Sequence, residues 1–336
     1  MSKFWEGKRV LITGACGTVG SELIRQLSLK QTAEIIGIDN NESELFFINQ
    51  NYRSNPDINF FLCDIKNKSQ LSRFFKGIDV VIHAAARKHV ILNEIAPSEA
   101  IYTNIVGTQN VINAALDAEV ERVIFTSSDK AVNPTNVMGT SKLMGERLMT
   151  AANAARRGPF PIFASTRFGN VLGSNGSVIP IFEKQINDGG PLTLTDPEMS
   201  RFVMTIDEAA SLVLDSVPLA KGGEVFVTKM PIMRIEDLAK GMMSVMEKLD
   251  TEIKIIGAKA GEKLYEELIN DEEVRRTLEI DNYFAVLPAF KGIYSDIDYS
   301  FTEEQKPVDR IYRSDLEPAM SVNEIAEYLK TKNLLR

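Results

Sequence analysis

The chain has 336 residues, of which 44% are hydrophobic and 25% charged, and its formal net charge is −8. This composition is typical of a folded globular protein and excludes collagen-like and wholly disordered chains, while the length suggests two lobes. The acidic balance argues against nonspecific binding of nucleic acid. No apolar run approaches the roughly 20 residues of a membrane span, and residues 1–6 lack the apolar segment of a signal peptide. Two cysteines, Cys16 and Cys63, cannot form a disulfide framework, so we expect a cytoplasmic protein.

Short apolar runs alternate with helical patterns through the first half of the chain. The runs of strand length lie at 9–12, 34–38, 59–62, 79–82 and 122–125, and helical periods lie between them at 21–29, 69–75 and 108–116. Nearly continuous apolar strands separated by helices indicate parallel strands buried on both faces. The pattern therefore predicts an α/β protein with a Rossmann-type, doubly wound parallel sheet.

The rhythm changes after Arg167, where Gly, Pro and Ser become dense. We expect a dinucleotide-binding domain over residues 1–167 and a smaller C-terminal substrate-binding lobe over 168–336, with the chain crossing between them. A late helix is predicted over 322–332, because Ser321 is a favourable N-cap residue.

A glycine-rich loop, Gly14-Ala15-Cys16-Gly17-Thr18-Val19-Gly20, follows the first predicted strand and opens a helix. Glycines there permit a tight turn and a close approach of a pyrophosphate to the helix N-terminus. Asp39 ends the second strand, where a carboxylate accepts hydrogen bonds from both ribose hydroxyls of NAD and repels the 2′-phosphate of NADP. Its neighbour Asn40 brings no positive charge. The alternatives are a simple glycine turn and an Asp39 that only caps the next helix.

Polar residues follow the fifth strand as Ser127-Ser128-Asp129-Lys130, and Met138 and Lys142 come shortly after. Polar groups at the carboxyl end of a central strand lie in the ligand crevice of such a sheet. Burial and mutual proximity are expected to bring the pKa values of Asp129 and Lys130 toward neutrality. The alternative is a solvated pair at a strand end, with Lys142 as an exposed helix lysine.

These motifs resemble those of the extended short-chain dehydrogenases/reductases, and among them the UDP-N-acetylglucosamine 4,6-dehydratases of bacterial surface-sugar biosynthesis. The resemblance covers most of residues 8–290. It rests on the glycine loop, Ala-Ala-Ala-Arg-Lys-His at 84–89, the 127–134 segment, Arg-Phe-Gly-Asn-Val-Leu-Gly-Ser at 167–174, and Gly-Glu-Lys-Leu-Tyr-Glu-Glu at 261–267.

The resemblance implies roles for the residues after the fifth strand. Lys130 is the base that removes the C5 proton, Asp129 is the acid at C6, and Lys142 binds the nicotinamide ribose. The superfamily's tyrosine base is replaced by Met138, whose thioether accepts no proton from the C4 hydroxyl. Asp129 is the first choice for that proton, with Ser128 as a relay or a positioning hydroxyl. Membrane-bound members of the branch also carry Met and retain the C5 configuration, so retention is expected here.

The resemblance also assigns the remaining ligand contacts. The NAD site comprises Gly14, Cys16, Gly17, Thr18, Val19, Gly20, Asp39, Asn40, Asp64, Ile65, Ala84, Ala85, Ala86, Asn104, Ser127, Lys142 and Arg167. The UDP-N-acetylglucosamine site is expected to comprise Lys88, His89, Asn170, Ser174, Ser177, Ile179, Pro180, Lys184, Arg201, Lys259 and Glu262. Lys184, Arg201 and Lys259 are included because basic side chains can bind the phosphates, and the alternative for each is an ordinary surface side chain. The carboxylates of the 261–267 segment fit an amphipathic helix as readily as a ligand site. With two histidines in the chain, no metal site is expected.

The function expected from these residues is an NAD-dependent 4,6-dehydratase that forms the 4-keto-6-deoxy sugar nucleotide with retention at C5. A homo-oligomer is expected, paired through helices near 101–118 and 139–155. The alternatives that stay open are a C5-inverting dehydratase, a GDP-sugar dehydratase, a sugar-nucleotide 4-epimerase, and a nucleotide-sugar sensor that has lost catalysis.

Overall fold

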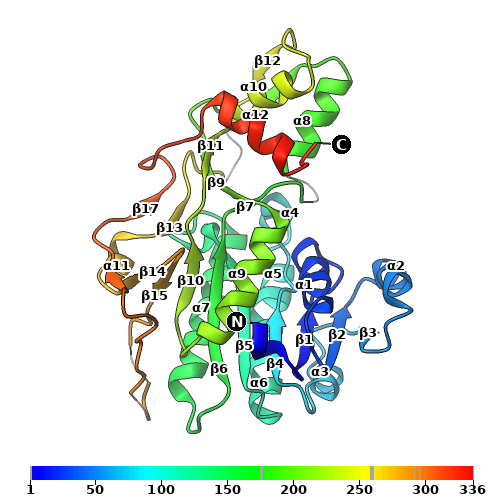
Figure 1. The fold of residues 1–336 in the computed structure, drawn as a ribbon, viewed down its shortest axis with the longest axis vertical. Coiled ribbons are helices and arrows are strands. Elements are labelled where there is room, and N and C mark those ends of the chain that lie inside the picture. The colour runs from blue at the N-terminus through cyan, green and yellow to red at the C-terminus, as the bar shows by residue number, and fades with distance from the viewer. Residues whose placement is uncertain (1, 175–176, 258–260, 291, 295, 336) are drawn as a thin grey trace.

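The computed structural model of the chain describes residues 2–174, 177–257, 261–290, 292–294 and 296–335. Within these residues a ten-stranded sheet forms the centre, in the order β16-β14-β15-β10-β6-β5-β4-β1-β2-β3 (Figure 1). Its strands are β1 (Arg9–Thr13), β2 (Glu34–Asp39), β3 (Ile58–Leu62), β4 (Val80–His83), β5 (Arg122–Ser128), β6 (Ile162–Phe168), β10 (Val225–Thr228), β14 (Thr277–Ile280), β15 (Tyr283–Val286) and β16 (Lys306–Pro307).

The strands from β3 to β10 are parallel, and β15, β14 and β16 extend the sheet in antiparallel pairing. The chain runs outward from β1 to β2 and β3, and then returns past β1 to β4, β5 and β6. The strand order thus reverses between β1 and β4, and a doubly wound sheet binds its ligand in the crevice at such a reversal. The predicted Rossmann-type fold is confirmed.

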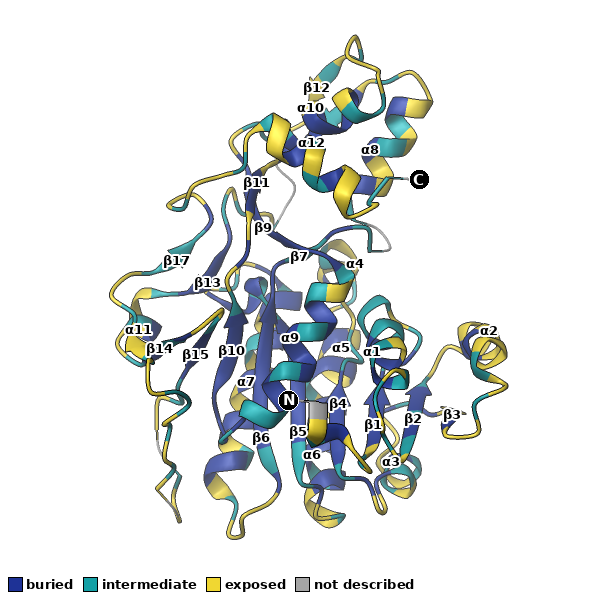
Figure 2. Cartoon of the chain, viewed as in Figure 1, coloured by how far each residue is buried: buried dark blue, intermediate teal, exposed yellow. Residues whose placement is uncertain are grey.

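Helices cover both faces of the sheet. They are α1 (Thr18–Ser28), α2 (Glu42–Tyr52) and α9 (Ile206–Leu219) on one face, and α3 (Lys68–Phe74), α6 (Gly107–Asp117) and α7 (Val137–Ala155) on the other, with η1 (Ser2–Trp5) at the N-terminus. Alternate residues of one strand enter opposite cores: Val10 and Ile12 pack with α1 and α9, whereas Leu11 packs with α3, α6 and α7. The sheet is therefore buried on both sides, as Figure 2 shows, which explains the nearly continuous apolar runs.

A smaller lobe with its own apolar core stands above the carboxyl ends of the parallel strands (Figure 1). It contains α8 (Val178–Asn187), β8 (Leu192–Leu194), α10 (Ile235–Val245), β12 (Ile253–Ile255) and α12 (Val322–Thr331). The connection to the sheet runs through β7 (Asn170–Val171), β9 (Ser200–Met204), β11 (Ile232–Arg234), β13 (Glu267–Ile269), α11 (Asp271–Val274) and β17 (Tyr312–Arg313). Ser321 caps α12 in a capping box with Glu324, close to the predicted helix start.

The central sheet does not end at residue 167, the predicted boundary between the two parts of the chain. Strands β10, β14, β15 and β16 follow it in sequence and extend the same sheet, and α9 packs against α1. The chain therefore crosses between the two parts more than once. The change of rhythm at 167 therefore marks the first excursion into the smaller lobe.

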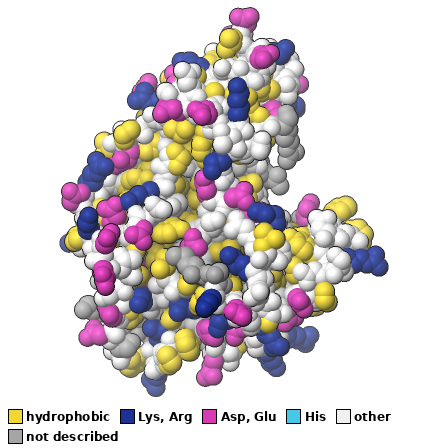
Figure 3. All heavy atoms as spheres, viewed as in Figure 1, with side chains coloured by type: hydrophobic (Ala, Val, Ile, Leu, Met, Phe, Trp, Pro, Cys, Tyr) yellow, Lys and Arg dark blue, Asp and Glu magenta, His cyan; other side chains and the backbone are white. Residues whose placement is uncertain are grey.

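The surface carries both signs of charge side by side. Lys and Arg side chains are interspersed with Asp and Glu over the face seen in Figure 3. No helix among the described residues is long and apolar enough to cross a membrane.

Candidate active site

Two cavities lie at the carboxyl ends of the parallel strands. The small cavity, of about 260 Å³, is lined by the segments that follow β1, β2, β3 and β4. The large cavity, of about 750 Å³, is bounded by Lys130 after β5, by residues 88–92 with the start of α4 (Val90–Ile95), by α8 and by the 261–266 segment. Its volume is in the range of small-molecule sites.

The small cavity gathers most of the residues assigned to the dinucleotide. Ten of them line it: Gly14, Cys16, Gly17, Asp39, Asn40, Asp64, Ile65, Ala84, Ala85 and Ala86. They meet because each follows a parallel strand, and parallel strands end at one edge of the sheet. A side chain at Gly14 would come within 2.6 Å of the Ala85 nitrogen, and its φ of +72° is unfavourable for other residues. The glycine is therefore required by the close approach of two loops.

Asp39 connects the end of β2 to the glycine loop through a hydrogen bond. Its Oδ2 accepts a hydrogen bond from the Cys16 backbone at 3.0 Å, and its Oδ1 accepts one from the Asn41 backbone at 3.0 Å. Helix α2 is capped by Asn41, which accepts from the Glu44 backbone, so Asp39 is not the capping residue. A carboxylate has about four lone-pair positions, so each Asp39 oxygen keeps acceptor capacity for a hydroxyl.

The helix that opens after the glycine loop presents free donors. No side chain caps α1, whose first turn holds Thr18, Val19 and Gly20. The first amides of a helix have no intrahelical acceptor, which suits an anion. These three residues do not line the small cavity with their side chains. Gly20 is needed for packing, because a Cβ there would overlap the Gly14 carbonyl.

Asn104 and His83 belong to a buried network behind the small cavity. Asn104 lies in η2 (Ile101–Val106), and its Nδ2 donates to the Arg87 carbonyl and to Ser141 Oγ, while its Oδ1 accepts from the Arg87 backbone. His83 bonds Thr13 and Thr108 through its two ring nitrogens, and burial lowers its pKa to about 3. The network orders the chain after β4, so Asn104 acts on the cavity through the backbone it holds.

Thr103 is a cavity residue that the sequence motifs missed. It lines the small cavity, and its hydroxyl is buried without a hydrogen-bond partner among the described residues. Ser127 Oγ, near the end of β5, is also buried and has no hydrogen-bond partner among the described residues. The Thr103 hydroxyl, which lies in the wall of the small cavity, fits a polar ligand there, whereas Ser127 lines neither cavity. Thr103 carries no signal in the sequence, because it sits mid-helix outside any motif.

Arg167 does not contact the dinucleotide cavity, and its assignment there is corrected. It is 1% exposed, and all five of its N–H groups donate to Glu146 on α7, Glu273 on α11 and the Leu268 carbonyl of β13. The two carboxylates lie 2.7–2.8 Å from its Nη2. With no donor left, Arg167 ties the sheet to α7 and to the segment after β13.

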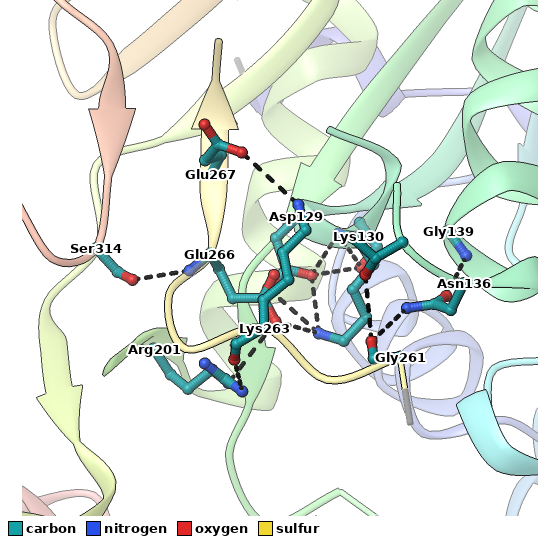
Figure 4. A network of polar contacts seen from close by, with 12 residues as sticks. Asp129, Lys130, Asn136, Gly139, Arg201, Gly261, Lys263, Glu266, Glu267 and Ser314 are labelled. Carbon is teal, nitrogen blue, oxygen red and sulfur yellow. Dashed lines mark hydrogen bonds and ion pairs between the residues drawn. The ribbon is translucent and has the colours of Figure 1, made fainter. Parts of the chain in front are cut away.

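Asp129 and Lys130 form η3 (Asp129–Ala131), a short 3₁₀ turn at the end of β5. Lys130 Nζ lies 3.1 Å from Asp129 Oδ1 (Figure 4). Ser128 Oγ donates a hydrogen bond to the same oxygen at 2.6 Å. Lys130 lines the large cavity, whereas Asp129 lies behind it and is 1% exposed. The pair is thus a partly buried ion pair, with the carboxylate buried and the Lys130 side chain 25% exposed, and not a fully solvated one.

Glu266 is the third member of this cluster and was not assigned from the sequence. Its Oε1 lies 3.2 Å from Lys130 Nζ and 3.7 Å from Arg201 Nε. The 261–267 segment is a turn followed by a strand, with Gly261 at φ +80° and β13 beginning at Glu267, so an amphipathic helix there is wrong. Glu262 and Glu266 are four residues apart, a spacing that fits an amphipathic helix as well as a ligand site. The sequence pattern alone therefore did not distinguish the two.

The pKa of Lys130 does not move toward neutrality. Burial lowers it, but Asp129 and Glu266 outweigh burial and leave the pKa above its ordinary value. The expected direction for Lys130 is therefore wrong, because the sequence showed one carboxylate beside this lysine and the fold brings two.

Met138 and Lys142 lie on the first two turns of α7. Met138 is 4% exposed, and Lys142 is buried with its Nζ donating to the Thr126 carbonyl at 2.8 Å. Burial lowers the pKa of Lys142 to about 8. Neither side chain lines either cavity, so Lys142 is a buried lysine and not the exposed helix lysine of the alternative.

Seven residues assigned to the substrate line the large cavity: Lys88, His89, Asn170, Ser174, Ser177, Arg201 and Glu262. Arg201 also donates to the carbonyls of Lys263 and Leu264, and so holds the 261–266 segment. Lys259 lies outside the described residues. The remaining three assignments fall on α8 and are corrected by its geometry.

Helix α8 presents a different face to the cavity from the one predicted. Val178, Ile181 and Phe182 line the large cavity. Ile179 is buried in the core of the smaller lobe, while Pro180 and Lys184 are exposed. Positions three and four apart share a helix face, so 180 and 184 share one that points away. The exposed Lys184 does not line this cavity.

The sheet forms a Rossmann-type crevice, and buried polar residues stand at the end of β5. Lys142 lies one helical turn after Met138, at the spacing of the Tyr-x-x-x-Lys motif. Together these features indicate an extended short-chain dehydrogenase/reductase. A family model described as "Polysaccharide biosynthesis protein" matches residues 10–288, and the chain belongs to this family.

Several relatives are similar over nearly the whole chain. A Methanocaldococcus jannaschii protein named "Uncharacterized membrane protein MJ1061" is 45% identical, covering 91% of this chain and 96% of its own. A Campylobacter jejuni "UDP-N-acetylglucosamine 4,6-dehydratase (inverting)" is 38% identical, covering 87% and 86%. Pen from Bacillus thuringiensis, known from an X-ray structure, is 37% identical in sequence. The two structures superpose with a TM-score of 0.91, covering 99% of this chain and 100% of Pen. Proteins named UDP-glucose 4-epimerase also match, for example one from Rickettsia rickettsii at 35% identity over 96% of both chains.

No group of three or more His, Cys, Asp or Glu side chains in the described part of the chain is arranged to hold a metal ion.

Proposed function

We propose that the protein is an NAD-dependent UDP-N-acetylglucosamine 4,6-dehydratase of surface-glycan biosynthesis that retains the C5 configuration. The product is then UDP-2-acetamido-2,6-dideoxy-D-xylo-hexos-4-ulose. The observation that carries the proposal is Lys130 in the wall of the large cavity, paired with Asp129 behind it, at the strand edge that also forms the small cavity. The relative named as a 4,6-dehydratase supports the same reaction class.

The residues of the small cavity fit NAD. The close approach at Gly14, the uncapped start of α1, the Asp39 carboxylate and the unpartnered hydroxyl of Thr103 suit a pyrophosphate and ribose hydroxyls. Bound NAD would supply a hydride acceptor for C4 and a hydride donor for C6, without net consumption.

The proton transfers fall to residues after β5. Asp129 accepts the C4 hydroxyl proton, with Ser128 as the relay because its hydroxyl already donates to this carboxylate. Lys130, as the neutral amine, removes the C5 proton, and Asp129 returns its proton to the C6 oxygen, which leaves as water. Lys130 then gives the C5 proton back. Atoms balance as the loss of one water from the sugar.

Incubation with UDP-N-acetylglucosamine and mass spectrometry tests the function. Loss of one water supports a dehydratase, and UDP- and GDP-sugars assayed in parallel identify the nucleotide. Unchanged mass with a new epimer would instead show a 4-epimerase, which the epimerase relatives favour but which needs neither a C5 base nor a C6 acid. Binding without product would show a sensor.

Retention at C5 is expected because Met138 offers no proton for the opposite face of the ring, whereas Lys130 returns the proton to the face it came from. The reaction run in H₂O should give a D-xylo product, assigned by proton NMR. The same reaction run in D₂O should place deuterium at C5, because the ammonium hydrogens of Lys130 exchange with solvent before one is returned. An L-arabino product as the primary species, as the name of the inverting relative implies for that protein, would contradict this interpretation of Met138.

Asp39 is expected to select NAD over NADP, because its carboxylate would repel a 2′-phosphate. Cofactor released from purified protein should be NAD, and Asp39→Ser should weaken NAD binding and narrow the preference over NADP. Arg87 is the one cation among the described residues that line the small cavity. NADP in the wild-type protein would overturn the role of Asp39, and Arg87→Ala would then show whether this cation holds the phosphate.

We also propose that the protein is a cytoplasmic homo-oligomer. Apolar side chains are exposed on η2 and α7, among them Ile101, Tyr102, Val106 and Met144. These helices are the ones expected to pair two copies, and burying apolar side chains favours association.

A further inference from the structure

Glu266 is a buried carboxylate for which the proposed reaction has no role so far. It is 2% exposed and contributes to the wall of the large cavity. Its backbone donates to Ser314 Oγ, and its Oε1 faces Lys130 Nζ at 3.2 Å (Figure 4). Its Oε2 is buried without a hydrogen-bond partner in the described residues. A buried, ionised oxygen without a donor is costly, so this environment makes the Glu266 carboxylate a better proton acceptor.

Lys130 poses a chemical problem that this contact can solve. The lysine must be a neutral amine before it can accept the C5 proton, yet it lies between two carboxylates that favour the ammonium form. Asp129 has to be ionised at the start of the cycle, because its first role is to accept the C4 hydroxyl proton. The lysine proton therefore needs another acceptor, and Glu266 is the other carboxylate in contact with Nζ.

We propose that Glu266 is the proton-accepting positioning partner of Lys130, taking the ammonium proton so that the neutral amine faces the C5 hydrogen. The inference rests on the proposed dehydration. In the step, Lys130–NH₃⁺ and Glu266–COO⁻ become Lys130–NH₂ and Glu266–COOH, with no change in total charge or bound protons. The amine then takes the C5 proton and later returns it, while Glu266 keeps its proton throughout.

The charges around Glu266 agree with this exchange. Burial raises the pKa of Glu266 and Asp129 adds to the rise, while Lys130 and Arg201 partly offset it. Among the described residues, these charged groups come from η3 and from β9. Because the proton moves within the pair, the neutral fraction of Lys130 does not depend on pH between the two apparent pKa values of the pair.

The test compares pH profiles of turnover for wild type, Glu266→Gln and Glu266→Asp. In Glu266→Gln, Lys130 must lose its proton to solvent, so the rate should rise about tenfold per pH unit below the lysine pKa. At neutral pH it should fall on the order of 10²-fold, as for loss of a proton-transfer partner. Wild type should show a flat profile over the same range, and Glu266→Asp should keep that shape at a lower rate.

Glu267→Gln is the matched control. Glu267 is the next carboxylate in the chain, but it pairs with Lys263 and accepts from Asn133 instead of facing Lys130. Its profile should match wild type. The proposal would be overturned if the pH profile of Glu266→Gln ran parallel to that of wild type, whatever its absolute turnover. A purely structural role of Glu266 lowers turnover without changing the slope of turnover against pH.

A second measurement separates this proposal from the proposed function. In protein labelled with ¹³Cε-lysine, the Lys130 signal, assigned by its absence in Lys130→Met, should titrate at lower pH in Glu266→Gln than in wild type or Glu267→Gln. Loss of a carboxylate 3.2 Å away predicts this direction. An unchanged Lys130 pKa would refute the coupling even if the protein dehydrates its sugar. A wild type that forms no dehydrated product would refute the function alone.

Discussion

Lys130→Ala is expected to lower the turnover of dehydration on the order of 10²–10⁴-fold while leaving bound NAD unchanged. The C5 proton loses its base, and general-base catalysis contributes about this factor. The small cavity, which holds the cofactor in the proposal, has no contact from Lys130, so cofactor content should not fall. The measurement is product formation by mass spectrometry together with NAD released per folded protein.

Small amines provide the control for Lys130→Ala. Lys130 faces the large cavity and its side chain is 25% exposed, so methylamine can reach the space left by the substitution. Added amine should restore part of the activity of Lys130→Ala and none of that of Glu266→Gln, which keeps its lysine. Near-normal turnover of Lys130→Ala without amine would remove this lysine from the mechanism.

Arg167→Met is expected to lower the free energy of unfolding by about 3–5 kcal/mol. The substitution leaves Glu146 and Glu273 buried without their shared cation, and a broken buried ion pair costs about this much. Urea denaturation monitored by circular dichroism measures the loss. NAD content per folded protein should stay at the wild-type level, because no Arg167 donor is free for a ligand.

The carboxylates themselves supply the control for Arg167. Changing Glu146 and Glu273 to Gln in the Arg167→Met chain removes the unpaired charges and should recover part of the lost stability. Loss of NAD from folded Arg167→Met protein, with little loss of stability, would restore Arg167 to the cofactor site and contradict the network seen here.

The sheet and the small cavity could be predicted because their signals are local. Apolar runs of strand length identify the parallel strands. Gly14 and Ala84 each follow one of them directly, and Asp39 is the last residue of another. Parallel strands end at one edge, so a residue's place just after a strand fixes its place in space. Asp129 and Lys130 follow β5 in the same way, and their pairing follows from adjacency.

Only the tertiary structure decided the contacts between segments far apart in the chain. Arg167 stands at a strand end like Lys130, yet Glu146 and Glu273 arrive from α7 and α11 and occupy every donor. Lys184 is basic and near a glycine-rich loop, yet the rotation of α8 turns it to solvent. Glu266 reaches Lys130 across more than a hundred residues and reverses the expected direction of the lysine's pKa.

The sequence by itself thus determined which residues end the strands and therefore form the crevice, because that information is carried by neighbours in the chain. The tertiary structure decided the charge state and the direction of each side chain there. Those properties depend on burial and on the nearest opposite charge, and both come from segments that meet only when the chain has folded.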